Sequence, residues 1–488
     1  MNLKLQNILK ISLYSLLIFL FLFNSPIFSQ EKFRKSPPYP DPLPELRLPS
    51  IESTVLSNGL GLSVVHITNR PVINLRLIIL TGENSSPDNL PGLATFTAKM
   101  LSKGTLTLSS SKIEETIESI GGNFSSVTYP DYSIFSLSFL DEYLDEALNV
   151  LSKMILQPTF TRREIDNVQR SMFYEIVRKS SEPEFIAKRL LFKNLFKENS
   201  YRKIAFNRED IKNLNRKDLI AFFNKYYRPN NSKLVLTGNL DLSTASRKVS
   251  AYLNTWEKKS LEYLPTTHPD PNKKIKICFI DVPNAKDATI LLGNSICSIT
   301  NNDFFSLLVL NQVLGGTPNS RLFMKLRESK GYAYWSFSTV EFFKHCGVFY
   351  VTARIRPEVI DVSLMESFNE IRKITKNKIP NYELEQAKSY LIGNFPLQII
   401  MYNNFSLKVS EFLAFNLGEK HWNKYYENIM LINSDKVFET AQKYLFSSPV
   451  VVIVGDINIV ANHLKEFEVE VYNTMGIFQY IIKKGVEK

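Results

Sequence analysis

An internal repeat limits the fold of this chain more than any other feature of its sequence. The segment KYYRPNNSKLVLTGNL resembles KYLFSSPVVVIVGDI, with Tyr227 matching Tyr444 and Gly238 matching Gly455 at the same spacing of 217 residues. In each half, a strand-like pattern is followed by an amphipathic helical pattern, in IFSLSFLDEYLDEALNVL and in VFYVTARIRPEVIDVSLMESF. The sequence therefore predicts an α+β protein built from two homologous halves.

The repeat and the composition along the chain predict six segments. They are a signal peptide (1–29), a Pro-rich lead-in (30–50), a first domain (51–260), a linker (261–274), a second domain (275–470) and a tail (471–488). Each domain of about 200 residues lies within the usual size range of an independent core.

The first 29 residues have the pattern of a secretory signal. Lys4 and Lys10 precede or flank an apolar run from Ile11 to Phe23, which is too short to span a bilayer. A short membrane anchor is the alternative, but no longer apolar stretch follows, so we expect no membrane span in the mature chain. The expected location is the periplasm of a two-membrane bacterium, or the exterior of another host.

Charge and metal-binding residues exclude several classes of function. Removing the predicted signal lowers the formal charge from +11 to +9, and the lysines are scattered, which favours solubility and affinity for acidic peptides over nucleic-acid binding. The five histidines are far apart, so no motif of paired histidines is present and we expect no cofactor. The three cysteines allow one disulfide, or three buried thiols.

The segment GLATFTAKMLSKGT (92–105) has helical spacing, with Thr95, Ala98 and Lys99 at positions i, i+3 and i+4 of one face. Together with LSNGLGLSVV, AFFNKYYRPNNSKLVLTGNLD and NSRLFMKLRESKGYAY, it makes residues 51 to 470 resemble the insulinase/pitrilysin family of zinc peptidases, which carry an inverted H-x-x-E-H motif. The resemblance implies two similar halves, with mostly antiparallel sheets covered by helices, that close like a clamshell around a peptide chamber.

The resemblance also implies that the zinc motif is degenerate in this chain. Thr95 and Lys99 stand where the family has its two histidines, and Ala98 stands where it has the general base. Glu175 stands where it has a third ligand, a glutamate. Because a lone carboxylate does not hold zinc and an ammonium repels it, we expect no bound metal and no peptidase activity by this chain alone. Lys99 and Glu175 form a salt bridge in the vacated place, or reach solvent independently.

A second set of family residues is retained. In LRESKGYAY, Arg327 and Tyr334 have the spacing of an arginine and a tyrosine that bind the substrate backbone in active relatives. The alternative is a surface arginine and a core tyrosine at a helix-to-strand junction.

Because the chain has lost the zinc-binding residues and retained Arg327 and Tyr334, it resembles the non-catalytic subunit of bacterial two-chain peptidases and of the mitochondrial processing peptidase. The implied partners are a secreted zinc subunit with an intact H-x-x-E-H motif and peptide substrates; a homodimer is also compatible with the sequence. The alternative is a scaffold or chaperone-like peptide-binding protein. An enzyme using other residues is the least supported reading, since no G-x-S-x-G motif is present.

Overall fold

The computed structural model describes residues 49–68, 70–197, 199–261, 274–417, 421, 424–445 and 449–483. The predicted signal peptide, nearly all of the lead-in and most of the predicted linker lie outside these residues.

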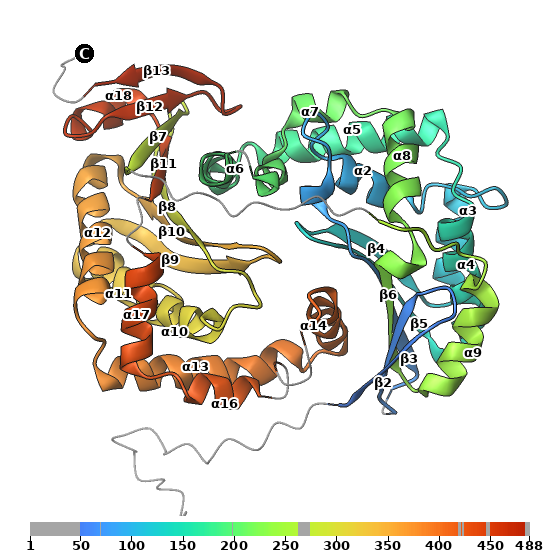
Figure 1. Ribbon diagram of the computed structural model, residues 1–488. Helices are drawn as coiled ribbons and strands as arrows, with labels where there is room; N and C mark the ends of the chain where they lie inside the picture. The colour runs from blue at the N-terminus through green and yellow to red at the C-terminus, as the bar shows by residue number, and fades with distance from the viewer. Residues whose placement is uncertain are drawn as a thin grey trace, which may run out of the picture. The chain divides into compact units, whose positions relative to one another are not determined.

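Within the described residues, the first half contains a six-stranded sheet in the order β1-β2-β6-β3-β5-β4 (Figure 1). Its strands are β1 (Ile51–Val55), β2 (Gly61–His66), β3 (Val72–Ile79), β4 (Asn123–Thr128), β5 (Ser133–Leu140) and β6 (Ser232–Gly238). β1 and β2 form an antiparallel hairpin around Asn58 and Gly59, whose φ of 89° suits glycine. β2 and β6 are parallel, and the other neighbouring strands are antiparallel.

The second half repeats this sheet, with an addition at one edge. Among the described residues it has seven strands in the order β13-β12-β7-β11-β8-β10-β9. These are β7 (Lys276–Asp281), β8 (Ala288–Ile296), β9 (Ala333–Phe342), β10 (Gly347–Ile355), β11 (Val450–Gly455), β12 (Val469–Tyr472) and β13 (Phe478–Ile482). The run β7-β11-β8-β10-β9 corresponds to β2-β6-β3-β5-β4, including the parallel first pair. The predicted fold class, two homologous α+β halves, is confirmed.

The end of the chain corrects the predicted boundary at residue 470. Within residues 471–488, assigned to a tail from sequence, Val471 and Tyr472 end β12 and Phe478–Ile482 forms β13, and β12 pairs in parallel with β7. β13 is exposed along most of its length, so its sequence lacks the alternation of apolar and polar residues that would predict a strand.

Helices surround both sheets. In the first half they are η1 (Glu83–Ser85), α2 (Leu93–Met100), α3 (Ser110–Ser119), η2 (Asp141–Tyr143), α4 (Leu144–Leu156), α5 (Arg162–Lys179), α6 (Pro183–Phe196), η3 (Ser200–Ala205), α7 (Arg208–Lys212), α8 (Arg216–Tyr226), η4 (Pro229–Asn231) and α9 (Leu242–Leu253). In the second half they are α10 (Phe304–Leu314), α11 (Arg321–Phe323), the π-helix η5 (Met324–Ser329), η6 (Pro357–Val359), α12 (Ile360–Lys376), α13 (Asn381–Ile399), α14 (Tyr402–Ala414), α16 (Tyr425–Met430), α17 (Ser434–Tyr444), α18 (Ile457–Val460) and η7 (Ala461–His463). No helix in the described part of the chain is both long enough and apolar enough to cross a bilayer.

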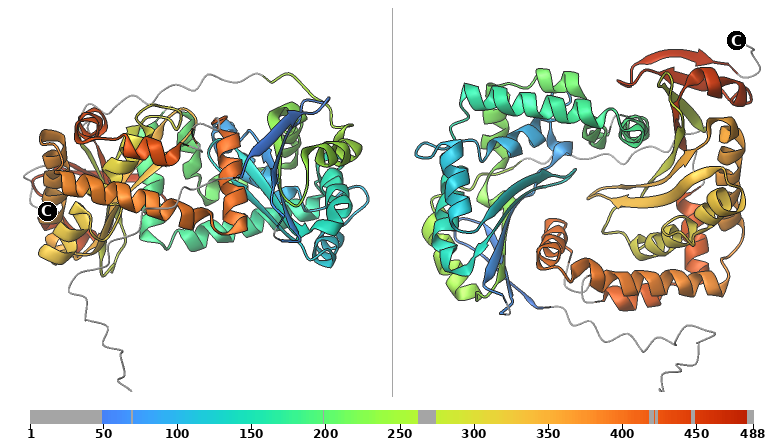
Figure 2. Two further views of the ribbon diagram at one scale, coloured as in Figure 1. Left: turned by 90° about the horizontal axis from the view of Figure 1, so that it is seen from below. Right: turned by 180° about the vertical axis from the view of Figure 1, so that it is seen from behind.

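Each half contributes one helix to the sheet of the other half (Figures 1 and 2). α6 packs on β8 and β11, where Leu191 lies over Gly293; a Cβ on Gly293 would come within 3.0 Å of the Leu191 side chain. α14 packs on β3 and β6, with Phe405 and Val409 buried against the first sheet. Both sheets therefore have apolar residues on both faces, and one face of each sheet is covered by a helix from the other half of the chain.

Arg76 of β3 fixes α14 to the first sheet. Its side chain is buried, and its guanidinium donates to Ser406 Oγ at 3.0 Å and to Asn403 O and Oδ1 at 2.9 and 2.7 Å, and also to Ser136. Burial lowers the pKa of Arg76 to about 10, so the side chain is still a cation at neutral pH.

Asp303, at the start of α10, holds α17 through its carboxylate. It accepts hydrogen bonds from Lys436 and Lys443 at 2.7 Å each and from Tyr444 at 2.9 Å. Burial opposes ionisation, but these donors outweigh it and lower the pKa of Asp303 to about 2.

We expect Asp303 to contribute a stability that is lost in acid. Because its folded-state pKa is below that of the unfolded chain, the contribution is complete above about pH 4 and disappears as the pH falls towards about 2. Urea unfolding of the wild type and Asp303→Asn at several pH values measures this. The gap in unfolding free energy should be largest at neutral pH and should narrow below pH 4; a gap that widens in acid would contradict the assignment.

The three cysteines are free thiols, with Cys278 and Cys346 buried and Cys297 partly buried. The structure therefore has none of the disulfides that the sequence allowed.

Candidate functional site

The degenerate motif lies on α2, which begins after Gly92 and carries Thr95, Ala98 and Lys99. Gly92 has no side chain to cap the helix, and the fully buried Glu83 does so instead. Its carboxylate accepts hydrogen bonds from the Gly92 and Thr95 backbone N–H groups at 2.5 and 3.2 Å, and from the hydroxyls of Ser86 and Thr95 at 2.8 Å each. Thr95 is thus bound to the cap of its own helix. Burial raises the pKa of Glu83 despite these four donors.

Glu83 was not predicted from the sequence. The helix begins at a glycine without a capping side chain, and two acidic residues, Glu83 and Asp88, precede it in a polar segment, so the sequence does not single out Glu83. Only the tertiary structure shows that the acid turns back to the helix.

Of the two alternatives for Lys99 and Glu175, a salt bridge or independent exposure to solvent, the structure shows the salt bridge. Lys99 Nζ is 3.2 Å from Glu175 Oε2, and Lys179 Nζ, one turn after Glu175 on α5, is 2.8 Å from Oε1. Partial burial would raise the pKa of Glu175, but Lys179 and Lys99 outweigh this and lower it. Each of the three side chains is about one-third exposed.

These residues do not fit a zinc ion. The four positions supply a hydroxyl held by Glu83, a methyl group, an ammonium and a carboxylate already shared by two lysines. Within the described part of the chain, no group of three or more histidine, cysteine, aspartate or glutamate side chains is arranged to hold a metal. An ammonium beside the remaining carboxylate takes the place that a cation would need.

A cavity of about 350 Å³ opens at this position. Its polar lining includes Glu83, Thr95, Lys99, Glu175 and Lys179, and part of its wall is the end of β4 and the residues that follow it, from Ser126 to Pro130. The remaining wall is mainly apolar and consists of Ala98, Met172, Ile176, Phe185, Ile204 and Phe206. The site is therefore a polar pocket with an apolar side, next to a strand.

Arg327 and Tyr334 are both accessible, and neither is a lining residue of this cavity. Arg327 lies on η5 with its side chain half exposed, 3.8 Å from Glu328 and above the ring of Phe323. Tyr334 lies on β9 and is 54% exposed, with the guanidinium of Arg354 at 6.0 Å from its ring. Tyr334 is therefore not a core residue, whereas Arg327 is a surface arginine as the alternative expected; their role in substrate binding stays a prediction.

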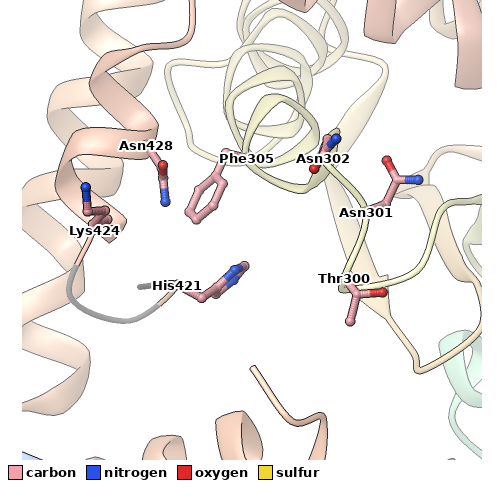
Figure 3. Close-up of a pocket in the computed structure, with 7 residues that line it drawn as sticks. All are labelled: Thr300, Asn301, Asn302, Phe305, His421, Lys424 and Asn428. Atoms are coloured by element: carbon pink, nitrogen blue, oxygen red, sulfur yellow. The ribbon is translucent and has the colours of Figure 1, made fainter. Parts of the chain in front are cut away.

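A second cavity, of about 420 Å³, lies in the second half around His421 (Figure 3). The His421 ring lies beside Phe305, with Lys424 and Asn428 on one side and Thr300, Asn301 and Asn302 on the other. Burial lowers the pKa of His421. The seven described residues that line it include no carboxylate or thiol to work with the imidazole, so this cavity offers no evident catalytic group.

Comparisons with known proteins match both halves. Residues 63–208 match the family model described as insulinase (peptidase family M16), and residues 213–391 match the model described as peptidase M16 inactive domain. The chain is 27% identical over 348 residues to "Uncharacterized zinc protease YmxG" of Bacillus subtilis, covering 70% of this chain and 82% of that protein. It is 25% identical over 332 residues to "Non-peptidase homolog YmxG" of Helicobacter pylori, covering 67% and 76%.

Two solved structures have the same fold. A peptidase M16 inactive domain from Pseudomonas fluorescens matches with a TM-score of 0.78 at 22% identity, covering 83% of this chain and 98% of that one. A protease from Helicobacter pylori matches with a TM-score of 0.74 at 18% identity, covering 84% and 100%. With two models of this family matching successive segments that together span most of the chain, the chain belongs to the insulinase family, peptidase family M16.

Proposed function

We propose that this protein is a catalytically inactive member of the family that acts as the substrate-binding, non-catalytic subunit of a two-chain zinc endopeptidase. The observation that carries the proposal is the Lys99–Glu175 ion pair at the position of the family's metal, with Ala98 in place of the base. No residue on this face of α2 can hold a metal-bound water or accept its proton.

Two further observations support the partner role. Arg327 and Tyr334 remain exposed, and a guanidinium and a phenol can both donate to a substrate carbonyl. One relative is named a non-peptidase homologue. Other relatives carry the name zinc protease, so the proposal that this chain is inactive rests on its own residues at positions 95, 98 and 99. The proposed location is outside the inner membrane, in the periplasm of a two-membrane host.

Co-expression with the secreted H-x-x-E-H chain of the same genome tests the proposal. We expect the two chains to copurify and to hydrolyse fluorescein-labelled casein only as a pair. Arg327→Ala should lower kcat/KM of the pair by about 10²-fold if its guanidinium supports the tetrahedral intermediate. Arg162→Ala, which removes an exposed arginine of α5, is the matched control and should leave kcat/KM unchanged.

The alternative is a scaffold or peptide-binding protein without a role in proteolysis. It predicts that adding this chain does not raise the activity of the zinc-motif chain, and that Arg327→Ala leaves the activity of the mixture unchanged. Sedimentation of the isolated chain, run beside the co-expression, distinguishes a monomer from a homodimer.

A further inference from the structure

We propose that Lys99 replaces the metal as a fixed cation, and that the cavity beside it binds the carboxylate of an acidic side chain in an extended peptide. This inference rests on the proposed peptide-binding function and adds a substrate class to it. The contacts of Lys99, the charges of the cavity, the neighbouring strand and the apolar wall support it independently.

The first support is the unused hydrogen-bonding capacity of Lys99. An ammonium has three protons to donate, and among the described residues its hydrogen-bond partner is Glu175 Oε2, at 3.2 Å. Glu175 holds the ammonium from one side, while the side chain lines the cavity and is 35% exposed. Protons of the ammonium are therefore left for an oxygen atom that enters the cavity.

The second support is the charge balance of the lining. Lys99 and Lys179 bring two positive charges, and Glu175 brings one negative charge. The other acid, Glu83, is fully buried, and four hydrogen bonds direct its oxygens to the start of α2 and to Ser86. A ligand carboxylate would balance the two accessible ammonium groups, whereas a lysine or arginine side chain would be repelled.

The third support is the neighbouring strand. β4 is the last strand in the order of the first sheet, and Ser126, Val127 and Thr128 line the cavity. An extended peptide can pair with such an edge through main-chain groups, and every second side chain then points to the same face. Pro130 has no N–H to donate, which limits pairing beyond the end of the strand.

The fourth support is the apolar wall. Met172, Ile176 and Phe206 offer methyl, methylene and aromatic groups near the two lysines. The methylene groups of a glutamate side chain can contact this wall while its carboxylate reaches Lys99. The expected ligand is therefore an extended peptide with a glutamate near its centre.

Fluorescence anisotropy with three labelled heptapeptides tests the inference. The peptides share alternating valine and threonine, have blocked termini, and differ only in a central Glu, Gln or Lys. We expect the Glu peptide to bind the wild-type chain at least about 10-fold more tightly than the Gln peptide, and the Lys peptide to bind most weakly. Because the contact is ionic, the Glu preference should shrink as NaCl is raised.

Two variants assign the effect to the cavity. Lys99→Met should bind the Glu and Gln peptides with equal affinity, while Lys112→Met, at an exposed lysine of α3, should keep the wild-type preference. Circular dichroism and thermal unfolding establish that both variants are folded. A Lys99→Met variant that unfolds is replaced by Lys99→Gln, which keeps a polar side chain and should lose the same preference.

The outcomes separate this inference from the proposed function. Equal binding of the Glu and Gln peptides to the wild type, or a Glu preference that survives loss of the Lys99 ammonium, would overturn the inference. If the two-chain peptidase is nevertheless active and sensitive to Arg327→Ala, the proposed function stands. Absence of binding to all three peptides, together with an inactive pair, would overturn both.

Discussion

The triple variant Thr95→His, Ala98→Glu and Lys99→His is expected to bind one zinc ion per chain, whereas the wild-type chain should bind none. Lys99 Nζ already lies 3.2 Å from Glu175 Oε2, so an imidazole at position 99 would be placed near the third ligand. Glu83 is hydrogen-bonded to the Thr95 side chain and could orient an imidazole at position 95 through its second nitrogen. Metal analysis after dialysis against a chelator-free buffer measures the stoichiometry.

The matched control is the same triple variant with Glu175→Gln. Removing the carboxylate should lower zinc affinity by at least about 10-fold, because losing even a residue that only hydrogen-bonds to a metal ligand costs that much. Added zinc should raise the melting temperature of the triple variant and leave that of the wild type unchanged, because binding stabilises only the folded state that holds the metal. A triple variant that folds and takes up no zinc would show that Glu175 is not at a ligand position.

The second large effect is expected from Arg76→Met. The substitution keeps an unbranched stem of similar length but removes the guanidinium that donates to Ser406, Asn403 and Ser136. Since the buried Ser406 and the part-buried contacts to Asn403 and Ser136 lose a charged donor, we expect a loss of roughly 3 kcal/mol in unfolding free energy. Urea unfolding followed by circular dichroism measures the loss.

Two variants check the cause. Arg162→Met, at an arginine whose side chain is 89% exposed, should change the unfolding free energy by less than about 0.5 kcal/mol. Arg76→Lys keeps the charge but cannot reach several acceptors with a planar fork, so it should fall between the wild type and Arg76→Met. A loss below about 1 kcal/mol for Arg76→Met would mean that α14 is held to the first sheet mainly by apolar packing of residues such as Phe405.

Part of the candidate site followed from the sequence. Helical spacing placed Thr95, Ala98 and Lys99 on one face of α2, and the family resemblance supplied Glu175 from a later helix. Lys179 could have been added, because it stands four residues after Glu175 on the same helix and can pair with it. The cap by Glu83 could not be predicted, since it depends on a loop folding back over the start of α2.

The sequence by itself determined the two-fold repeat and the helical face without zinc chemistry. These features follow from local spacing and from comparison of one half with the other. Only the tertiary structure decided that β6 lies between β2 and β3, that α6 and α14 are exchanged between the halves, and that β12 and β13 extend the second sheet. The spacing of apolar residues specifies which face of a helix or strand is buried, but not which other element packs against that face. The partner is chosen by pairing of distant backbone groups and by burial of apolar surface across the whole chain.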